Sequence, residues 1–100
     1  MKKIDDCYII VSDDLALVAR GVTRDRQLCH FDEKNKKRIL MYHTEGIALN
    51  CIFNFPFDNI TRKAINHAIT MGWITKEESA VGDYSGINSH LIAIPCEVTI

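Results

Sequence analysis

Residues 58–73, DNITRKAINHAITMGW, constrain the fold more than any other stretch of the chain. Their apolar side chains recur with the period of an α-helix and occupy one half of its circumference. The residues of this apolar half are Ile60, Ala64, Ile65, Ala68, Ile69 and Met71. Asp58 or Asn59 can cap the first free amides, and Gly72 can adopt the left-handed conformation that closes a helix. The sequence therefore predicts one amphipathic helix over about residues 59–71.

The segments on either side of this helix have the composition of β-strands. Several runs rich in β-branched and aromatic residues are bounded by turn-forming residues, which is the usual sequence pattern of strands. These runs are residues 7–11, 26–31, 38–44, 47–53 and 90–94. Polar residues 32–37 predict the tip of a hairpin between the second and third runs, and Glu45-Gly46 predicts the turn to the fourth. The second, third and fourth runs are therefore expected to form a meander.

Residues 13–20 fit two structures. The preceding Ser12 offers a helix cap, the first turn is acidic and Gly21 suits a helix end, so we favour a short helix. Leu17 would then fall on the polar side of that helix. A second strand after a turn at residues 12–14 is the alternative.

A strand-rich half with segregated helices predicts an α+β fold. We expect an antiparallel sheet of four to five strands packed against one principal amphipathic helix, about residues 59–71. Thr75 and Glu78 have the spacing of a capping box, which adds a further helical turn. The 100 residues suffice for one hydrophobic core, so residues 1–100 are expected to form a single compact domain. Without a long apolar run or an export signal, the protein is expected to be cytoplasmic and to have no membrane partner.

The sequence contains no motif that points to catalysis, a cofactor or a metal. Its four cysteines and four histidines include no pair at a metal-binding spacing, and Ser85 lies one position late for a nucleophile elbow. In a cytoplasmic protein the cysteines are expected to be reduced thiols: Cys7, Cys29, Cys51 and Cys96. We therefore expect no cofactor, no metal and no catalytic residue. A small hydrolase-like enzyme with a Cys/His pair is the third alternative, because such a pair meets only in the folded chain.

A nucleic-acid-binding regulator is the second alternative. Residues 72–75, GWIT, follow the central helix in a way that resembles winged-helix DNA-binding domains, where an apolar helix ends in glycine and runs into a wing strand. The resemblance implies two more helices upstream and base-reading residues on the central helix, where the candidates are Arg62, Lys63 and Asn66. The chain upstream has the pattern of strands, so packing on a sheet explains the helix as well.

The charge balance excludes a global attraction to nucleic acid, because 12 basic and 13 acidic residues give a net charge of −1. Charged recognition must therefore be local. The densest candidate is the predicted hairpin tip, which Arg24 and Arg26 extend along the chain. The tip contains Lys34, Lys36, Lys37 and Arg38.

This predicted basic hairpin has two interpretations. Lysine-rich tips keep strands soluble and protect sheet edges, which requires no partner. The functional interpretation is a contact with an acidic or phosphate-bearing surface. We favour a small interaction protein, an inhibitor or regulator of the kind carried by phages and other mobile elements. Its expected partner is another protein or a protein–nucleic-acid complex, rather than nucleic acid alone.

Overall fold

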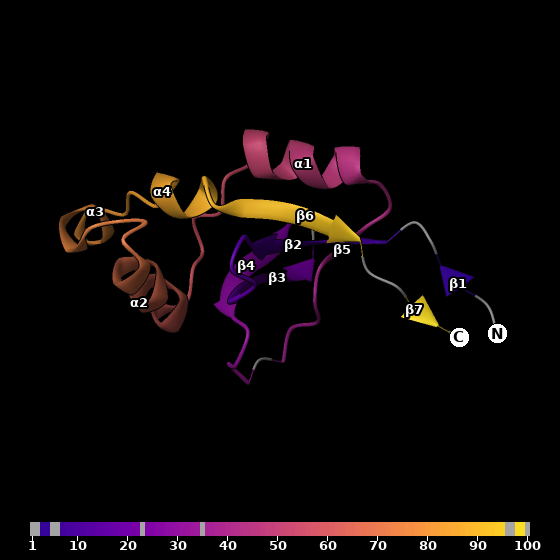
Figure 1. Ribbon diagram of the computed structural model, residues 1–100, viewed down its shortest axis with the longest axis horizontal. Coiled ribbons are helices and arrows are strands. Elements are labelled where there is room, and N and C mark those ends of the chain that lie inside the picture. Colours follow the sequence, from indigo (N-terminus) through magenta and orange to yellow (C-terminus); the bar gives the residue numbers. More distant parts are fainter. Residues whose placement is uncertain (1–2, 5–6, 23, 35, 96–97, 100) are drawn as a thin grey trace.

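A computed structural model describes residues 3–4, 7–22, 24–34, 36–95 and 98–99. Its strands and helices are segregated along the chain, which confirms the α+β class (Figure 1). The strands are β1 (Lys3–Ile4), β2 (Tyr8–Ser12), β3 (Leu17–Val22), β4 (Asp25–His30), β5 (Met41–Tyr42), β6 (Leu91–Pro95) and β7 (Val98–Thr99). The helices are α1 (Glu45–Asn54), α2 (Arg62–Met71), α3 (Lys76–Ala80) and α4 (Ser85–Asn88).

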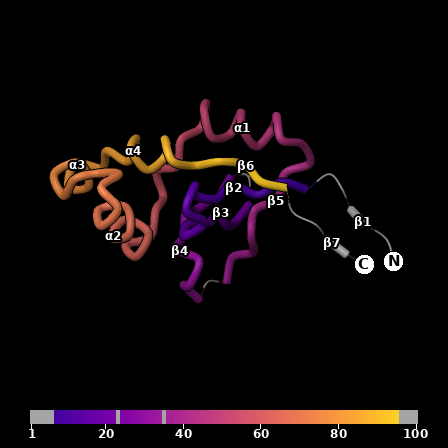
Figure 2. Tube along the Cα trace, in the orientation of Figure 1, coloured from indigo at the N-terminus to yellow at the C-terminus, as the bar shows by residue number. Residues whose placement is uncertain are grey.

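Within the described ranges, β2 to β6 form one five-stranded antiparallel sheet, and β1 and β7 form a separate two-stranded ribbon. β2 lies at the centre. It pairs along its whole length with β6, so that the start and the end of the chain run side by side (Figure 2). Its other edge pairs with β3 at Val11 and Val18 and with β5 at Ile9 and Met41. Beyond the Val11–Val18 pair, β2 and β3 diverge and leave a fork between them. Segment 38–42 lies in this fork, because β5 pairs with β2 and Ile39 bridges to Arg20 of β3.

Both longer helices cover the same face of the sheet. α1 lies over β2, β5 and β6, and α2 lies against β4 (Figure 1). Paired residues of adjacent strands share a face, so Ala19 and Leu28 point into the core beneath the helices. Val18 and Cys29 point to the opposite face.

The hairpin predicted for residues 26–44 is wrong. β4 pairs with β3 from Leu17 opposite His30 to Val22 opposite Asp25, so the hairpin turn lies between those two strands. The polar residues 32–34 and 36–37 instead lie on a crossover, which carries the chain from β4 past β3 into the fork. Figure 1 shows this crossover on the side of the sheet away from α1. Polar turn residues indicate a connection but not which strands pair on either side of it. The hairpin was predicted from this connection alone.

The helix favoured for residues 13–20 is also wrong, and the alternative strand is confirmed as β3. The chain reverses at residues 12–15, where Leu15 has a φ of 63° and the Leu15 amide donates to the Ser12 carbonyl. Leu17 and Ala19 then alternate into the core. The residues that suggested a helix cap and an acidic first turn serve the chain reversal instead. The Ser12 hydroxyl accepts a hydrogen bond from the Leu17 amide at 2.9 Å, and the Asp14 carboxylate accepts one from the Ala16 amide at 3.1 Å.

The strand predicted for residues 47–53 is helix α1. Thr44 is its N-cap, and its hydroxyl oxygen accepts the Ile47 amide at 3.1 Å. Ala48 and Ile52, one turn apart, are buried against the sheet. α1 has almost no polar face, so its sequence lacks the helical periodicity that α2 shows.

The central helix is confirmed but begins later than predicted. α2 starts at Arg62, and its N-cap is Thr61 rather than Asp58 or Asn59. Residue Ile60 forms a bridge to Leu28 of β4 instead of a first helical turn. Gly72 ends the helix in the left-handed conformation, with a φ of 79°.

Two further local predictions are confirmed. Thr75 and Glu78 form the capping box of α3, and the strand predicted for residues 90–94 is β6. Of the extended segment expected after Pro95, residues Cys96, Glu97 and Ile100 lie outside the described ranges. None of the helices that the structure describes has the length and apolar character of a membrane-spanning segment.

Candidate functional site

At its C-terminal end the crossover is held to the sheet by hydrogen bonds and one ion pair. The Arg20 guanidinium donates to the Lys37 carbonyl oxygen at 3.0 Å. The Lys37 ammonium contacts both carboxylate oxygens of Asp25 at 3.1 Å. Immediately beyond it, the Arg38 carbonyl oxygen accepts the Gly21 amide at 2.8 Å. The side chains of this segment therefore have a defined position relative to β3 and β4.

Glu33 fixes the other end of the crossover. Its Oε2 accepts the His30 amide at 2.7 Å and the Thr61 hydroxyl at 2.6 Å. Thr61 is also the N-cap of α2, so one carboxylate links β4, the crossover and the start of that helix. The crossover is thus anchored at both ends.

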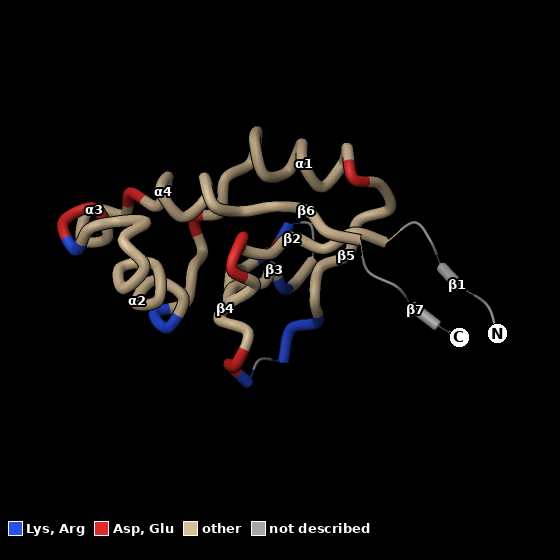
Figure 3. The backbone as a smooth tube through the Cα atoms, in the orientation of Figure 1, with Lys and Arg blue, Asp and Glu red and all other residues tan. Residues whose placement is uncertain are grey.

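The structure divides the predicted basic residues into two groups. Four remain in or next to the crossover, on the side of the sheet away from α1, as the blue segments of Figure 3 show. These are Lys34, Lys36, Lys37 and Arg38, and we call them the basic crossover. Arg24 and Arg26 line a separate hollow of about 480 Å³ beside the end of α1, together with Asn54, Phe55, Pro56 and others. Arg26 does not join the basic crossover, because its guanidinium stacks on the Phe57 ring at 4.5 Å.

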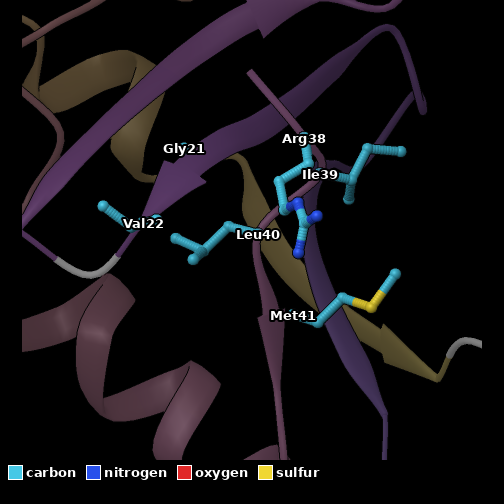
Figure 4. A pocket seen from close by; sticks show the side chains of 6 residues that line it. All are labelled: Gly21, Val22, Arg38, Ile39, Leu40 and Met41. Atoms are coloured by element: carbon cyan, nitrogen blue, oxygen red, sulfur yellow. The ribbon is translucent and has the colours of Figure 1, made fainter.

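An apolar hollow of about 510 Å³ adjoins the basic crossover (Figure 4). It lies where β3 ends and segment 38–41 enters the sheet, and its lining includes Arg38. Val22 is 57% exposed and Met41 is 53% exposed at this hollow. The exposed cation Arg38 therefore lies beside exposed apolar side chains. The sequence alone did not indicate this combination, since Val22 belongs to β3, a different segment of the chain from Arg38 and Met41.

A second cluster joins histidines to aspartates. His67 Nε2 lies 2.7 Å from Asp14 Oδ2, and His90 Nδ1 lies 2.8 Å from Asp13 Oδ2. Trp73 stacks on His90, with ring centroids 4.6 Å apart, and meets His67 edge to face at 5.4 Å. The cluster ties the turn before β3 to α2 and to the start of β6. Sequence spacing could not reveal it, because these residues come from four separate segments.

The cluster links separate segments of the fold through its hydrogen bonds and ring contacts. No described set of three histidine, cysteine or acidic side chains is arranged to hold a metal ion. No cavity with a described lining includes either histidine–aspartate pair. In this cluster the partners of the histidines are aspartates, whereas the alternative enzyme requires a histidine beside a cysteine.

The pKa of Asp14 is lower than its ordinary value. Burial alone would raise it, but hydrogen bonds from the Ser12 hydroxyl, His67 and the Ala16 amide favour the ionised form and outweigh burial. A carboxyl with a depressed folded-state pKa stabilises the fold above its unfolded pKa of about 3.9. That stabilisation is lost as the pH falls through the folded-state pKa.

We expect Asp14→Asn to lower the melting temperature at pH 5 by about 4–8 °C, the effect of losing about 1 kcal/mol of hydrogen bonding. The difference between wild type and variant should shrink as the pH approaches 2, where the wild-type carboxyl is protonated. Thermal unfolding followed by circular dichroism at both pH values measures this. Asp58→Asn, at an exposed aspartate, is the matched control and should change little. An equal difference at both pH values would contradict the argument.

A third feature is a smaller cavity of about 260 Å³ beneath α1. It is lined by Arg26 of β4, Tyr42 of β5, Cys51 of α1 and Phe55, the residue that follows α1. Tyr42 is only 7% exposed, and its hydroxyl group is buried without a hydrogen-bond partner in the described part of the chain. Of these four, only Arg26 was a predicted binding residue, because a strand over residues 47–53 would not place Tyr42, Cys51 and Phe55 around one cavity.

Comparison with family models, characterised proteins and solved structures found no match to this chain. The function is therefore argued from the surface and the cavities described above.

Proposed function

We propose that this chain is a small interaction protein that binds an acidic or phosphate-bearing surface of a protein or protein–nucleic-acid complex. It would act as an inhibitor or regulator by occupying that surface, in the cytoplasm, and a phage or mobile element is a fitting source. The observation that carries the proposal is the anchored basic crossover beside the hollow of Figure 4.

Anchoring matters because flexible lysines lose conformational freedom when they bind. Here Lys37 is engaged with Asp25, and its main chain is held by Arg20. Lys34, Lys36 and Arg38 are left exposed on an anchored segment. A segment that is already ordered presents these charges at a lower entropic cost than a mobile tip would.

The apolar neighbours favour a protein surface over bare nucleic acid. Val22 and Met41 are exposed beside Arg38, and protein interfaces are enriched in methionine and arginine. A nucleic-acid backbone would pair with the cations but leave these two side chains uncovered. Charge at the rim and apolar area at the centre is the usual arrangement of a protein interface.

The test is a triple variant, Lys34→Ser, Lys36→Ser and Arg38→Gln. Heparin serves as a sulfated probe for an anionic surface, and titration calorimetry at two salt concentrations measures its affinity. We expect the dissociation constant to rise about 10–100-fold, because several charge-assisted contacts are lost. The melting temperature should stay within about 2–4 °C of wild type, since exposed charges contribute little to folding.

The matched control removes three other exposed cations, by Arg62→Gln, Lys63→Ser and Lys76→Ser on α2 and α3. Both variants change the net charge by the same amount. Equal loss of affinity in the two variants would show that heparin senses only total charge, which contradicts the proposal. A random DNA duplex is the second probe, and tighter binding to it than to heparin would favour the nucleic-acid-binding alternative.

A further inference from the structure

The cavity beneath α1 has a donor that no group in the described part of the chain uses. The Tyr42 hydroxyl is buried, and neither Arg26 nor Cys51 meets it with hydrogen-bond geometry, although both lie close enough to influence its ionisation. A buried polar group without a partner destabilises a fold, because it has lost its hydrogen bonds to water. Unsatisfied buried polar groups are rare in native proteins, and a bound ligand can supply the missing hydrogen-bond partner.

Arg26 supplies a second donor to the same cavity. Its guanidinium is half-buried and stacks on Phe57, and none of the carboxylates within the described ranges forms an ion pair with it. Its bond to the Cys51 carbonyl oxygen is long, at 3.5 Å. A guanidinium group has five N–H donors, so most of its hydrogen-bonding capacity remains for a ligand.

We propose that this cavity binds a carboxylate carried on a small apolar body, with Tyr42 and Arg26 as the two donors. A guanidinium fork matches the two oxygens of a carboxylate, and a neighbouring hydroxyl can donate to one of them. Phe55, which is 58% exposed, forms an apolar wall at the cavity's edge and would cover the body of the ligand.

The ionisation of Tyr42 agrees with this role. Burial, and then the neighbouring Cys51, raise the pKa of Tyr42 to about 12, while Arg26 lowers it. The hydroxyl therefore keeps its proton at neutral pH and acts as a donor. An ionised tyrosine would repel a carboxylate.

The size of the cavity limits the ligand. Its volume of about 260 Å³ is below the range of sites for drug-sized molecules, which begins at about 300 Å³. A small organic acid or one acidic side chain of a partner fits that size. Both sources present the same chemistry, and the inference does not rest on the proposed function, because the basic crossover lies on the opposite side of the sheet (Figure 3).

The experiment titrates the full chain with phenylacetate, with its neutral analogue phenylacetamide and with a blocked dipeptide that contains glutamate. Amide chemical shifts of residues 26, 42 and 51 report occupancy. We expect phenylacetate or the dipeptide to shift these amides saturably, and phenylacetamide to bind at least about tenfold more weakly because it lacks the charge. Tighter binding of phenylacetate would indicate a free acid as the natural source, and tighter binding of the dipeptide a partner's side chain.

Tyr42→Phe is the decisive variant, because it removes only the hydroxyl oxygen. We expect it to weaken the bound carboxylate about tenfold while the melting temperature of the unliganded protein stays equal or rises. Arg26→Gln should weaken binding at least as much. Tyr84→Phe, at a tyrosine outside the cavity, should leave binding unchanged.

Three results would overturn the proposal. The first is equal affinity for phenylacetate and phenylacetamide. The second is no shift of the three amides by either carboxylate at concentrations up to about 10 mM, well above the range of specific binding. The third is a clear fall in the melting temperature of unliganded Tyr42→Phe, which would mean that the hydroxyl already has a partner inside the protein.

Discussion

Replacing Ala68 by aspartate should leave the protein largely unfolded at room temperature. Ala68 is completely buried between α2 and the sheet, where a carboxylate has neither room nor a partner. A buried unpaired charge belongs to the changes that cost about 4 kcal/mol or more, which approaches the lower end of the about 5–15 kcal/mol that stabilises a domain of this size. Chemical denaturation followed by tryptophan fluorescence measures the loss through Trp73.

The neighbouring positions on α2 provide the controls. Lys63→Asp lies on the exposed side and should change the free energy of unfolding by no more than about 0.5 kcal/mol. Ile65→Asp and Ile69→Asp should give intermediate losses, because both side chains are only half-buried. Their order distinguishes this packing from the one that the helical wheel implies, in which the isoleucines would be the most sensitive positions. Similar losses at Lys63 and Ala68 would contradict the packing described here.

Gly21→Ala should also be strongly destabilising. Gly21 has a φ of 108°, and a Cβ atom there would lie 2.1 Å from the Asp25 carbonyl oxygen. Strained backbone and a clash with main-chain atoms together should cost about 3 kcal/mol or more. The same change displaces the Gly21 amide from the Arg38 carbonyl oxygen, so heparin affinity should fall along with the melting temperature.

Gly46→Ala is the control for that substitution. Gly46 lies in the first turn of α1, and the nearest atom to an added Cβ would be the Thr44 hydroxyl oxygen at 3.9 Å. Alanine is the better helix former, so this variant should be neutral or up to about 1 kcal/mol more stable. If Gly21→Ala had the same melting temperature as Gly46→Ala, the close approach of Gly21 to the Asp25 carbonyl oxygen would be wrong.

Local signals in the sequence were reliable at two helix ends but misleading at two others, since Ser12 begins no helix and neither Asp58 nor Asn59 caps α2. Gly72 closes α2 and Thr75 caps α3 because each motif needs only its own neighbours along the chain. The strands β2 and β6 were recognisable from their β-branched residues, and β4 was predicted at residues 26–31 although it contains none. The α+β class follows from these elements without knowledge of how the strands pair.

The errors arose where tertiary packing decides. Residues 47–53, IALNCIF, have the composition of a buried strand, yet they form a helix that leaves Ile47 and Phe53 exposed. A helix without a polar face lacks the periodicity on which such a prediction depends. The pairing of β4 with β3 rather than with residues 38–44 is likewise a choice between partners, which no single segment encodes.

The candidate sites depended on those same choices. The basic residues of the crossover were identified from their density along the chain, and the structure keeps them together. Arg26 was identified from the same density but faces α1, because adjacent residues of a strand point to opposite faces and Asp25 already faces the crossover. The Tyr42 cavity requires α1 to lie over β5, so it was beyond the reach of sequence reasoning once α1 was misassigned.

The ladder between β2 and β6 also has a consequence for the order of folding. It joins Tyr8 to Pro95 and Ser12 to Leu91, so one edge of the central strand is completed only by the last strand of the sheet. Contacts so distant in sequence close slowly, because the chain entropy of the whole intervening loop is lost first. On the ribosome, β2, β3 and β4 can pair early, but β2 keeps an open edge until residue 95 has left the exit tunnel. For that interval the nascent chain exposes an apolar strand that other chains can pair with, and a chaperone that covers this edge would lower the risk of aggregation.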